Sequence, residues 1–217
     1  MPHAKPFTAT RMATRTAIIL FLFTIGSTAV LAGIYLLTKP AIDASAMVNK
    51  MRAIGEVLPP GSYDNDLLKD TLLLPVTPAL GLDDSSIVYR GRKGGQPAAL
   101  VLEAVASDGY SGRIRLLVGV KADGALTGVR VTEHKETPGL GDYIDPKKDK
   151  NKEHPWIGQF DGQSLETLGE REWKVKKDGG HFDSIAGATI SPRAVVKAVH
   201  KTLDYVAAHR DALYAAK

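Results

Sequence analysis

The sequence of 217 residues contains no cysteine. This absence excludes a disulfide framework, thiolate ligation of an iron–sulfur cluster, a zinc ribbon and a cysteine nucleophile. The main part of the chain also lacks a surplus of charge. Three of the 28 basic side chains lie among the first 37 residues, which hold no acid, and the other 25 nearly balance 24 acidic ones. A nearly neutral body is poor at binding a phosphate backbone, so we expect no nucleic-acid partner.

Charge is absent altogether between Arg15 and Lys39. Residues 17–37 form a run of 21 mostly apolar residues. As a helix this run would rise about 31 Å, which is enough to cross a hydrocarbon core about 30 Å thick. The run therefore predicts a single transmembrane helix.

The positive charges around this run predict its orientation. Lys5, Arg11 and Arg15 precede it, so the positive-inside rule places residues 1–16 in the cytoplasm and the main domain on the outer side of the membrane. A cleaved signal peptide is the alternative, because residues 44–46 loosely resemble a cleavage site. The apolar part of a signal peptide is usually about 7–15 residues long, however, so we favour an uncleaved anchor.

Helical spacing continues after the apolar run. Met51, Ile54 and Leu58 predict a stalk helix within residues 38–60, ended by the two prolines at its C-terminus. No element is predicted for residues 64–82, where prolines interrupt a leucine-rich stretch.

Four short apolar or alternating runs follow, and each predicts a strand. They cover residues 87–90, 98–106, 114–120 and 126–133. Asp123-Gly124 between the last two is a hairpin signal, so the strands should pair antiparallel. A last helix is predicted over residues 192–209, with Ser191 as its N-cap. Residues 61–217 are thus expected to form one α+β domain, an antiparallel sheet flanked by helices.

Residues 181–192 read HFDSIAGATISP and form the first segment of chemical interest. The small residues at 186–188 allow close backbone approach, and Thr189 stands just before a predicted helix. Exposed N–H groups and the positive end of the helix dipole favour a phosphate there. The pattern presents the Thr189 hydroxyl beside an anion site. A simple turn with a capping residue is the alternative interpretation, because helix starts rich in small residues are common.

Residues 134–142 read HKETPGLGD and form the second segment. They open a loop over 134–162, and a loop of this length inside a compact domain is usually functional or mobile. Pro138-Gly139 suits a type II turn, which could lay N–H groups and a leucine against a flat ring. Taken alone, the segment is better explained as a plain surface turn.

Together, the two segments resemble the signatures of FMN-binding domains. Asp183 and the AGATIS sequence after it are similar to that family's Ser/Thr-Gly-Ala-Thr-x-Ser/Thr motif, although Ala186 stands where Ser or Thr is usual. The HxETPGLG sequence is similar to the family's second signature. Their order and their separation of about 50 residues make the pair more specific than either motif.

The resemblance implies one FMN per chain, attached covalently to Thr189 by a flavin transferase that uses FAD and Mg²⁺. It implies that Thr137 and Leu140 flank the isoalloxazine ring, while Glu136 and Gly139 shape the loop. The cofactor-binding residues expected from it are Thr189, Gly187, Ala188, Ser191, Asp183, Glu136, Thr137, Gly139 and Leu140.

The remaining candidates are interpreted as structural. His134, His154 and His181 do not show the HxxxH or HxxE spacing of metal ligands, so no metal site is expected. Trp156 and Phe160 are candidates for covering a flavin, but we expect them to pack in the core. No residue is expected to be catalytic.

The length, the single anchor and both motifs most resemble the G-subunit family of the Rnf ion-translocating oxidoreductases. That resemblance implies a membrane-anchored flavoprotein that relays electrons within a redox-driven ion translocase and is not catalytic alone. It also implies a bacterial inner membrane, with the main domain in the periplasm. Its partners would be the other membrane and iron–sulfur subunits of the Rnf complex, a flavin transferase during maturation, and the lipid bilayer. Two alternatives remain: the C subunit of a Na⁺-translocating NADH:quinone reductase, and a membrane-tethered flavodomain that acts as a sensor or scaffold.

Overall fold

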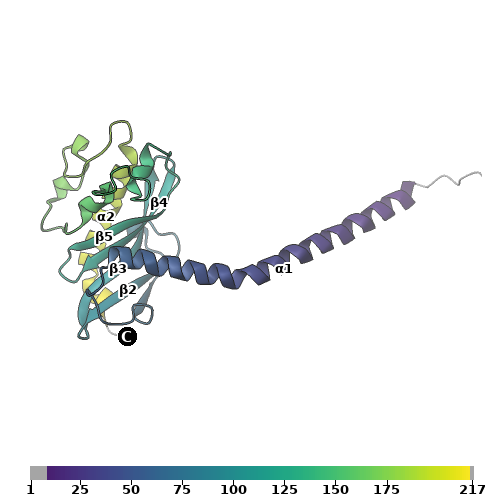
Figure 1. Cartoon of the computed structure of the whole chain (residues 1–217), viewed down its shortest axis with the longest axis horizontal. Coiled ribbons are helices and arrows are strands. Elements are labelled where there is room, and N and C mark those ends of the chain that lie inside the picture. The colour runs from purple at the N-terminus through teal and green to yellow at the C-terminus, as the bar shows by residue number, and fades with distance from the viewer. Residues whose placement is uncertain (1–8, 216–217) are drawn as a thin grey trace, which may run out of the picture. The chain divides into compact units, whose positions relative to one another are not determined.

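The computed structural model describes residues 9–215, and the chain divides into two units, residues 1–50 and 51–217. Helix α1 (Ala9–Val57) runs from the first unit into the second (Figure 1), so the apolar run and the stalk belong to one helix. Residues 1–8, which include Lys5, lie outside the described range.

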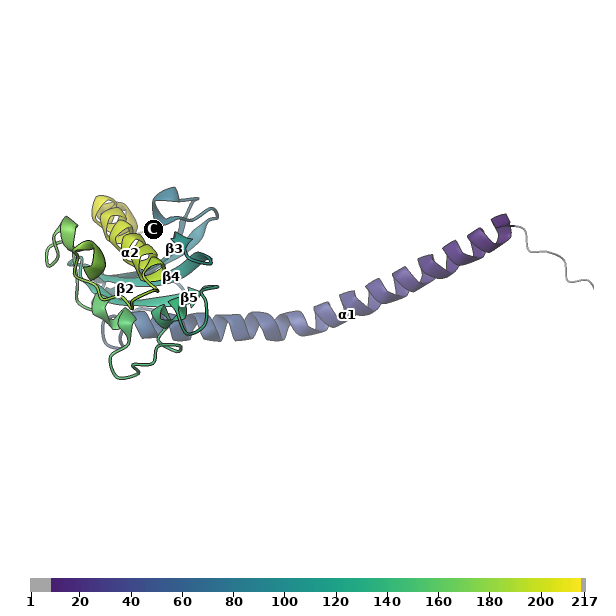
Figure 2. The same ribbon diagram turned by 90° about the horizontal axis from the view of Figure 1, so that it is seen from above.

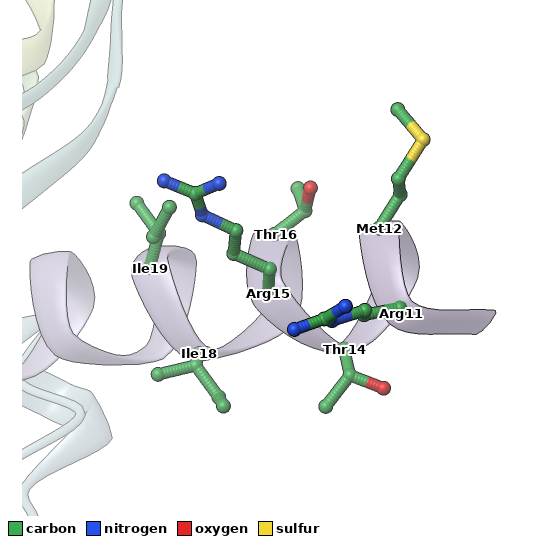
Figure 3. Close-up of a pocket in the computed structure, with 7 residues that line it drawn as sticks. All are labelled: Arg11, Met12, Thr14, Arg15, Thr16, Ile18 and Ile19. Carbon is green, nitrogen blue, oxygen red and sulfur yellow. The ribbon is translucent and has the colours of Figure 1, made fainter. Parts of the chain in front are cut away.

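The first unit is the long N-terminal part of α1. Within its residues Ala9–Ile42, a stretch of 18 residues has a mean hydropathy of 2.3, and the helix is long and apolar enough to cross a membrane. The Thr24 hydroxyl donates to the Leu20 carbonyl at 2.9 Å, so this polar group is satisfied within the helix. Figure 3 shows Arg11 and Arg15 projecting from the first turns, ahead of the apolar residues.

The second unit is built on one five-stranded antiparallel sheet whose strands follow chain order. The strands are β1 (Thr71–Leu74), β2 (Ser86–Lys93), β3 (Gln96–Gly109), β4 (Gly112–Lys121) and β5 (Leu126–Glu133). The antiparallel sheet and its last four strands confirm the prediction. The hairpin expected at Asp123-Gly124 joins β4 to β5. Its loop has three residues, 122–124, in which Gly124 has φ +91° and its N–H donates to the Lys121 carbonyl at 3.0 Å.

Strand β1 was not expected from the sequence. Its four residues, TLLL, lie in the leucine-rich stretch and show no alternation of polar and apolar side chains. Pairing with β2, in which Leu72 lies opposite Val88, makes it a strand.

The two faces of the sheet are covered by different helices (Figure 2). Helix α2 (Ile190–Ala208) lies over one face, where its buried valines join the main core with Leu100 of β3. The last turns of α1 cover the other face, where Ile54 and Val57 pack with Val101, the next residue of β3. Neighbouring residues of a strand point to opposite faces, which explains why β3 is buried on both sides.

Two glycines let the end of α1 lie directly on the sheet. Gly119 and Gly128 are paired across β4 and β5. A Cβ on Gly119 would lie 2.5 Å from the Val57 carbonyl oxygen, and one on Gly128 would lie 3.1 Å from the Val57 Cα. The Thr127 hydroxyl donates to the same carbonyl, which satisfies one of the groups left open at the helix end.

Between β5 and α2 the chain has no strand and no long helix. This stretch holds the short 3₁₀ helices η2 (Gly141–Ile144), η3 (Trp156–Phe160), η4 (Glu170–Glu172) and η5 (Lys176–Asp178), while η1 (Pro78–Leu80) precedes β2 and α3 (Arg210–Tyr214) follows α2. Trp156 and Phe160 are buried in the main core, as expected. Phe160 stacks on Phe182 with ring centroids 4.6 Å apart. The long loop is therefore attached to the core by its aromatic residues.

Candidate functional site

Both signature segments contain a turn of the same kind. In residues 185–188 the last N–H donates to the first carbonyl at 3.0 Å, and in residues 137–140 the equivalent distance is 3.1 Å. The third residue of each turn has positive φ: +85° at Gly187 and +76° at Gly139. A type II turn requires positive φ at this position, which explains both glycines. The turn expected at Pro138-Gly139 is thus present.

Thr189 occupies the N-cap position of α2, because this helix begins at Ile190. The expected helix start at Pro192 and N-cap at Ser191 are wrong by two residues. The first intrahelical hydrogen bond runs from the Arg193 N–H to the Thr189 carbonyl at 3.1 Å. The Thr189 side chain is only 7% exposed and makes no capping hydrogen bond. Its hydroxyl therefore stands beside the first N–H groups of the helix, which have no intrahelical acceptor.

A buried carboxylate joins the two signature segments. The Ser191 hydroxyl donates to Glu136 Oε2, and the Ser111 N–H donates to Glu136 Oε1 at 3.0 Å. Glu136 is 4% exposed and Ser191 1%, so both groups need these partners. A Cβ on Gly141 or on Gly109 would lie 2.9 Å from a carboxylate oxygen of Glu136. The glycines make room for the Glu136 carboxylate. Because the Ser191 hydroxyl is bonded to this carboxylate, Ser191 does not serve as the N-cap.

Tyr143 forms a second connection, and the sequence did not single it out. Its phenol oxygen accepts the Ile185 N–H at 3.1 Å and donates to the Ala188 carbonyl at 3.3 Å. Burial raises the pKa of Tyr143 above its ordinary value, so the phenol keeps the proton that it donates. The one signal in the sequence was its place directly behind the second signature.

The remaining expected residues lie at the surface of the site. The Asp183 carboxylate forms an exposed ion pair with Lys176 at 2.7 Å. The Gly139 N–H donates to Asp142 Oδ1 at 2.8 Å, which holds the second turn. Thr137 is half-buried. The structure thus joins Glu136 to Ser191 beside Thr189, but it directs the Asp183 side chain to solvent.

Exposed apolar side chains extend from both segments. Leu140 and Ile185 are each 53% exposed, and Ile190 is 44% exposed. Large apolar side chains exposed at a site with an uncommitted hydroxyl are typical of a surface that another group covers. The planar ring of a flavin has the matching chemistry.

A hollow of about 700 Å³ borders the first segment at residues 183–185. It is lined by Arg130, Tyr143, Asp149, Asn151, Glu153, His154, Pro155, Trp156, Gly158, Gln159, Asp161, Asp183, Ser184 and Ile185. Burial raises the pKa of Asp161, and the charge of Arg130 opposes this rise. Thr189 is not among the residues that line the hollow.

The residues around Thr189 fit an FMN. The uncommitted hydroxyl and the N–H groups at the start of α2 suit a phosphate, and the exposed apolar side chains suit a ring. Between residues 9 and 215, no three His, Cys, Asp or Glu side chains are arranged to hold a metal ion.

Comparison with known proteins gives two family matches. Residues 109–204, which include both signature segments, match the FMN-binding domain. Residues 7–57 match the RnfG N-terminal region.

Several curated proteins are similar over nearly the whole chain. The G subunit of the ion-translocating oxidoreductase complex of Pseudomonas aeruginosa is 48% identical over 93% of this chain and 92% of its own. The G subunits of the same name from Pseudoalteromonas atlantica and Pectobacterium atrosepticum are 41% and 42% identical, over 93% and 88% of this chain and 92% and 89% of their own.

Proposed function

Since the chain belongs to the family of G subunits of ion-translocating oxidoreductase complexes, we propose that it carries one covalent FMN on Thr189 and relays electrons within such a complex. The observation that carries the proposal is the uncommitted Thr189 hydroxyl at the start of α2, beside a loop joined to it by Glu136 and Ser191. The similarity to G subunits favours this function over the C subunit of a Na⁺-translocating NADH:quinone reductase and over a sensor or scaffold.

In the proposed attachment, Thr189 Oγ1 attacks the phosphorus on the flavin side of the FAD pyrophosphate. A P–O bond to Thr189 forms, the bond from this phosphorus to the bridging oxygen breaks, and AMP leaves. The hydroxyl proton passes to a base of the flavin transferase, and nothing is oxidised or reduced. The Thr189 hydroxyl makes no capping hydrogen bond, so it is free for this reaction.

The surrounding residues would hold the cofactor by its two ends. The N–H groups at the start of α2 favour the phosphate, because they lack acceptors and lie at the positive end of the helix dipole. Thr137, Leu140 and Ile190 would lie against the ring. A bound flavin supplies the electron-transfer chemistry, which no side chain of this protein provides.

The partners follow from the same chemistry. The chain has no cysteine, so it cannot ligate an iron–sulfur cluster by thiolate. Electrons must then enter and leave through other proteins, which we assign to the membrane and iron–sulfur subunits of the Rnf complex. The flavin transferase is a transient partner, and the lipid bilayer surrounds the apolar part of α1.

The proposed orientation places the N-terminus in the cytoplasm and the sheet domain in the periplasm of a bacterial inner membrane. Arg11 and Arg15 lie in the first turns of the span Ala9–Ile42, ahead of its uncharged part, as the positive-inside rule requires. A periplasmic phosphatase reporter fused after Lys217 should be active. Activity from a cytoplasmic reporter alone would contradict the orientation, and a mature chain beginning near residue 47 would replace the anchor by a signal peptide.

The direct test is covalent flavin on a denaturing gel. The full chain, exported in cells that contain flavin transferase, should give a fluorescent band that Thr189→Ala abolishes. Thr132→Ala changes an exposed threonine on β5 and is the matched control, and Ser191→Ala leaves the attachment hydroxyl in place. Both should stay fluorescent. A fluorescent Thr189→Ala band would refute the attachment site.

A further inference from the structure

Residues 183–188, directly ahead of Thr189, belong to no strand and no helix. Four of their backbone groups are hydrogen-bonded by side chains from residues 143–159. The Asp183 N–H donates to Gln159 Oε1 at 2.8 Å, and the Asp183 carbonyl accepts from Trp156 Nε1 at 2.6 Å. Tyr143 bonds the Ile185 N–H and the Ala188 carbonyl.

We infer that Tyr143, Trp156 and Gln159 are positioning residues, which hold residues 183–188 in the geometry that presents the Thr189 hydroxyl for flavin attachment. This inference rests on the proposed function and adds a role for three residues that neither signature contains. We call these three residues the clamp.

Tyr143 is the central member of the clamp because one phenol oxygen bonds both ends of the turn 185–188. The ring itself is held edge-on to Trp156, with centroids 5.8 Å apart. Since the phenol is buried and protonated, it keeps the donor that the Ala188 carbonyl needs. Ala188 directly precedes Thr189, so a shift of this carbonyl moves the attacking oxygen.

Trp156 and Gln159 are themselves held in place. The Trp156 backbone N–H donates to Asp149 Oδ2 at 2.6 Å, and the Gln159 amide nitrogen donates to the Trp156 carbonyl at 3.1 Å. The Gln159 amide therefore makes a hydrogen bond with each of its two polar atoms. Its nitrogen donates within η3, and its oxygen accepts the Asp183 N–H. A clamp whose members are fixed in this way can orient a segment that has no regular structure of its own.

The clamp matters for rate because group transfer depends on alignment. A displacement of about 1 Å at a reacting group can cost about a hundredfold in rate. The turn 185–188 keeps its own backbone hydrogen bond and Gly187 without the clamp, so removing the Tyr143 hydroxyl should loosen the turn without unfolding the domain.

The test compares Tyr143→Phe with Tyr214→Phe. Tyr214 is also buried, but its hydroxyl has no hydrogen-bond partner among residues 9–215, which makes it a matched control. Purified full-length chain in detergent is mixed with flavin transferase, FAD and Mg²⁺, and the initial rate of covalent flavin incorporation is measured against chain concentration.

We expect Tyr143→Phe to lower kcat for attachment about tenfold with an unchanged KM, a difference of about 1.4 kcal/mol in the barrier. Trp156→Phe, which keeps an aromatic ring but removes the donor to Asp183, should also lower kcat. Tyr214→Phe should match the parent chain, and melting temperatures should show that all variants are folded.

Unchanged kcat in both Tyr143→Phe and Trp156→Phe would overturn the inference, and so would a rise in KM alone. These outcomes differ from failure of the proposed function. If the parent chain takes no flavin on Thr189, the proposed function is refuted. If the parent chain and both variants take flavin at equal rates, only the role of the clamp is refuted.

Discussion

The sheet and the site segment, which we define as residues 134–191, are stabilised by different kinds of interaction. Strands β2 to β5 share long backbone ladders with a few register shifts, and Leu100 and Val118 lie fully buried in the core between the sheet and α2. The site segment consists of turns and 3₁₀ helices, and the side chains of Glu136 and Tyr143 bond it across 42 to 55 residues of sequence. The sheet therefore depends on backbone pairing and burial. The site segment is attached to the same core by Trp156, Phe160 and Phe182, but its turns are fixed by a few distant polar contacts.

The largest effect should come from the sheet core. Leu100→Ala removes a fully buried side chain on β3 and should lower the free energy of unfolding by about 4 kcal/mol, measured by urea denaturation. Leu73→Ala on β1 is the control, because Leu73 is 68% exposed and should cost less than about 0.5 kcal/mol. Equal losses would show that burial does not distinguish these strands.

The next effect concerns the polar edge of the sheet. Asp70 Oδ1 lies 2.6 Å from Arg90, and Oδ2 lies 2.6 Å from Arg92. Burial alone raises the pKa of Asp70, but the hydrogen bond from Arg92 and the charge of Arg90 outweigh it and lower this pKa below 3.8. Asp70→Asn leaves Arg90 buried without its counter-charge and should cost about 3 kcal/mol at pH 7.

The pH dependence of this loss tests its cause. A carboxylate whose pKa is lower in the folded state stabilises the fold above its unfolded pKa and loses this contribution as pH falls through the folded value. The difference in free energy of unfolding between the parent chain and Asp70→Asn should therefore be largest above about pH 5 and should decrease below pH 3.8. Asp66→Asn, which removes an exposed ion pair with Lys69, should have nearly the same free energy of unfolding as the parent chain at any pH.

A smaller and more local effect is expected from the site segment. Glu136→Gln replaces a carboxylate that accepts two hydrogen bonds, and its amide nitrogen cannot accept one of them. The free energy of unfolding should fall by about 1–2 kcal/mol. Hydrogen exchange should accelerate at Ser111 and at the start of α2 but not in the sheet core. Uniform acceleration would show that the site and the sheet open together.

The smallest effect on stability should come from the surface of the site. The double variant Thr137→Ala, Leu140→Ala changes a half-buried and an exposed residue, so the domain should stay folded with covalent FMN. Loss of the ring contacts should shift the flavin potential and slow electron flow through the assembled complex. An unchanged potential and unchanged turnover would show that the ring rests elsewhere.

The same contrast explains what the sequence predicts. Alternating side chains and an Asp-Gly turn specify strands locally, so four strands and their antiparallel pairing were predicted, while β1 acquires its structure only by pairing with β2. The start of α2 was predicted two residues late because the Ser191 hydroxyl bonds Glu136 instead of capping the helix. The signature motifs identify the site, but Tyr143 contributes through a fold-dependent contact that no local pattern shows.

The central claim is that Thr189 carries the flavin, and peptide mapping tests it directly. Trypsin cleaves after Lys177 and Arg193, so one peptide contains Thr189 together with Ser184 and Ser191. Fragmentation mass spectrometry of this peptide, from chain matured with flavin transferase, should place one FMN phosphodiester on Thr189. An unmodified peptide, or FMN on Ser184 or Ser191, would contradict the account.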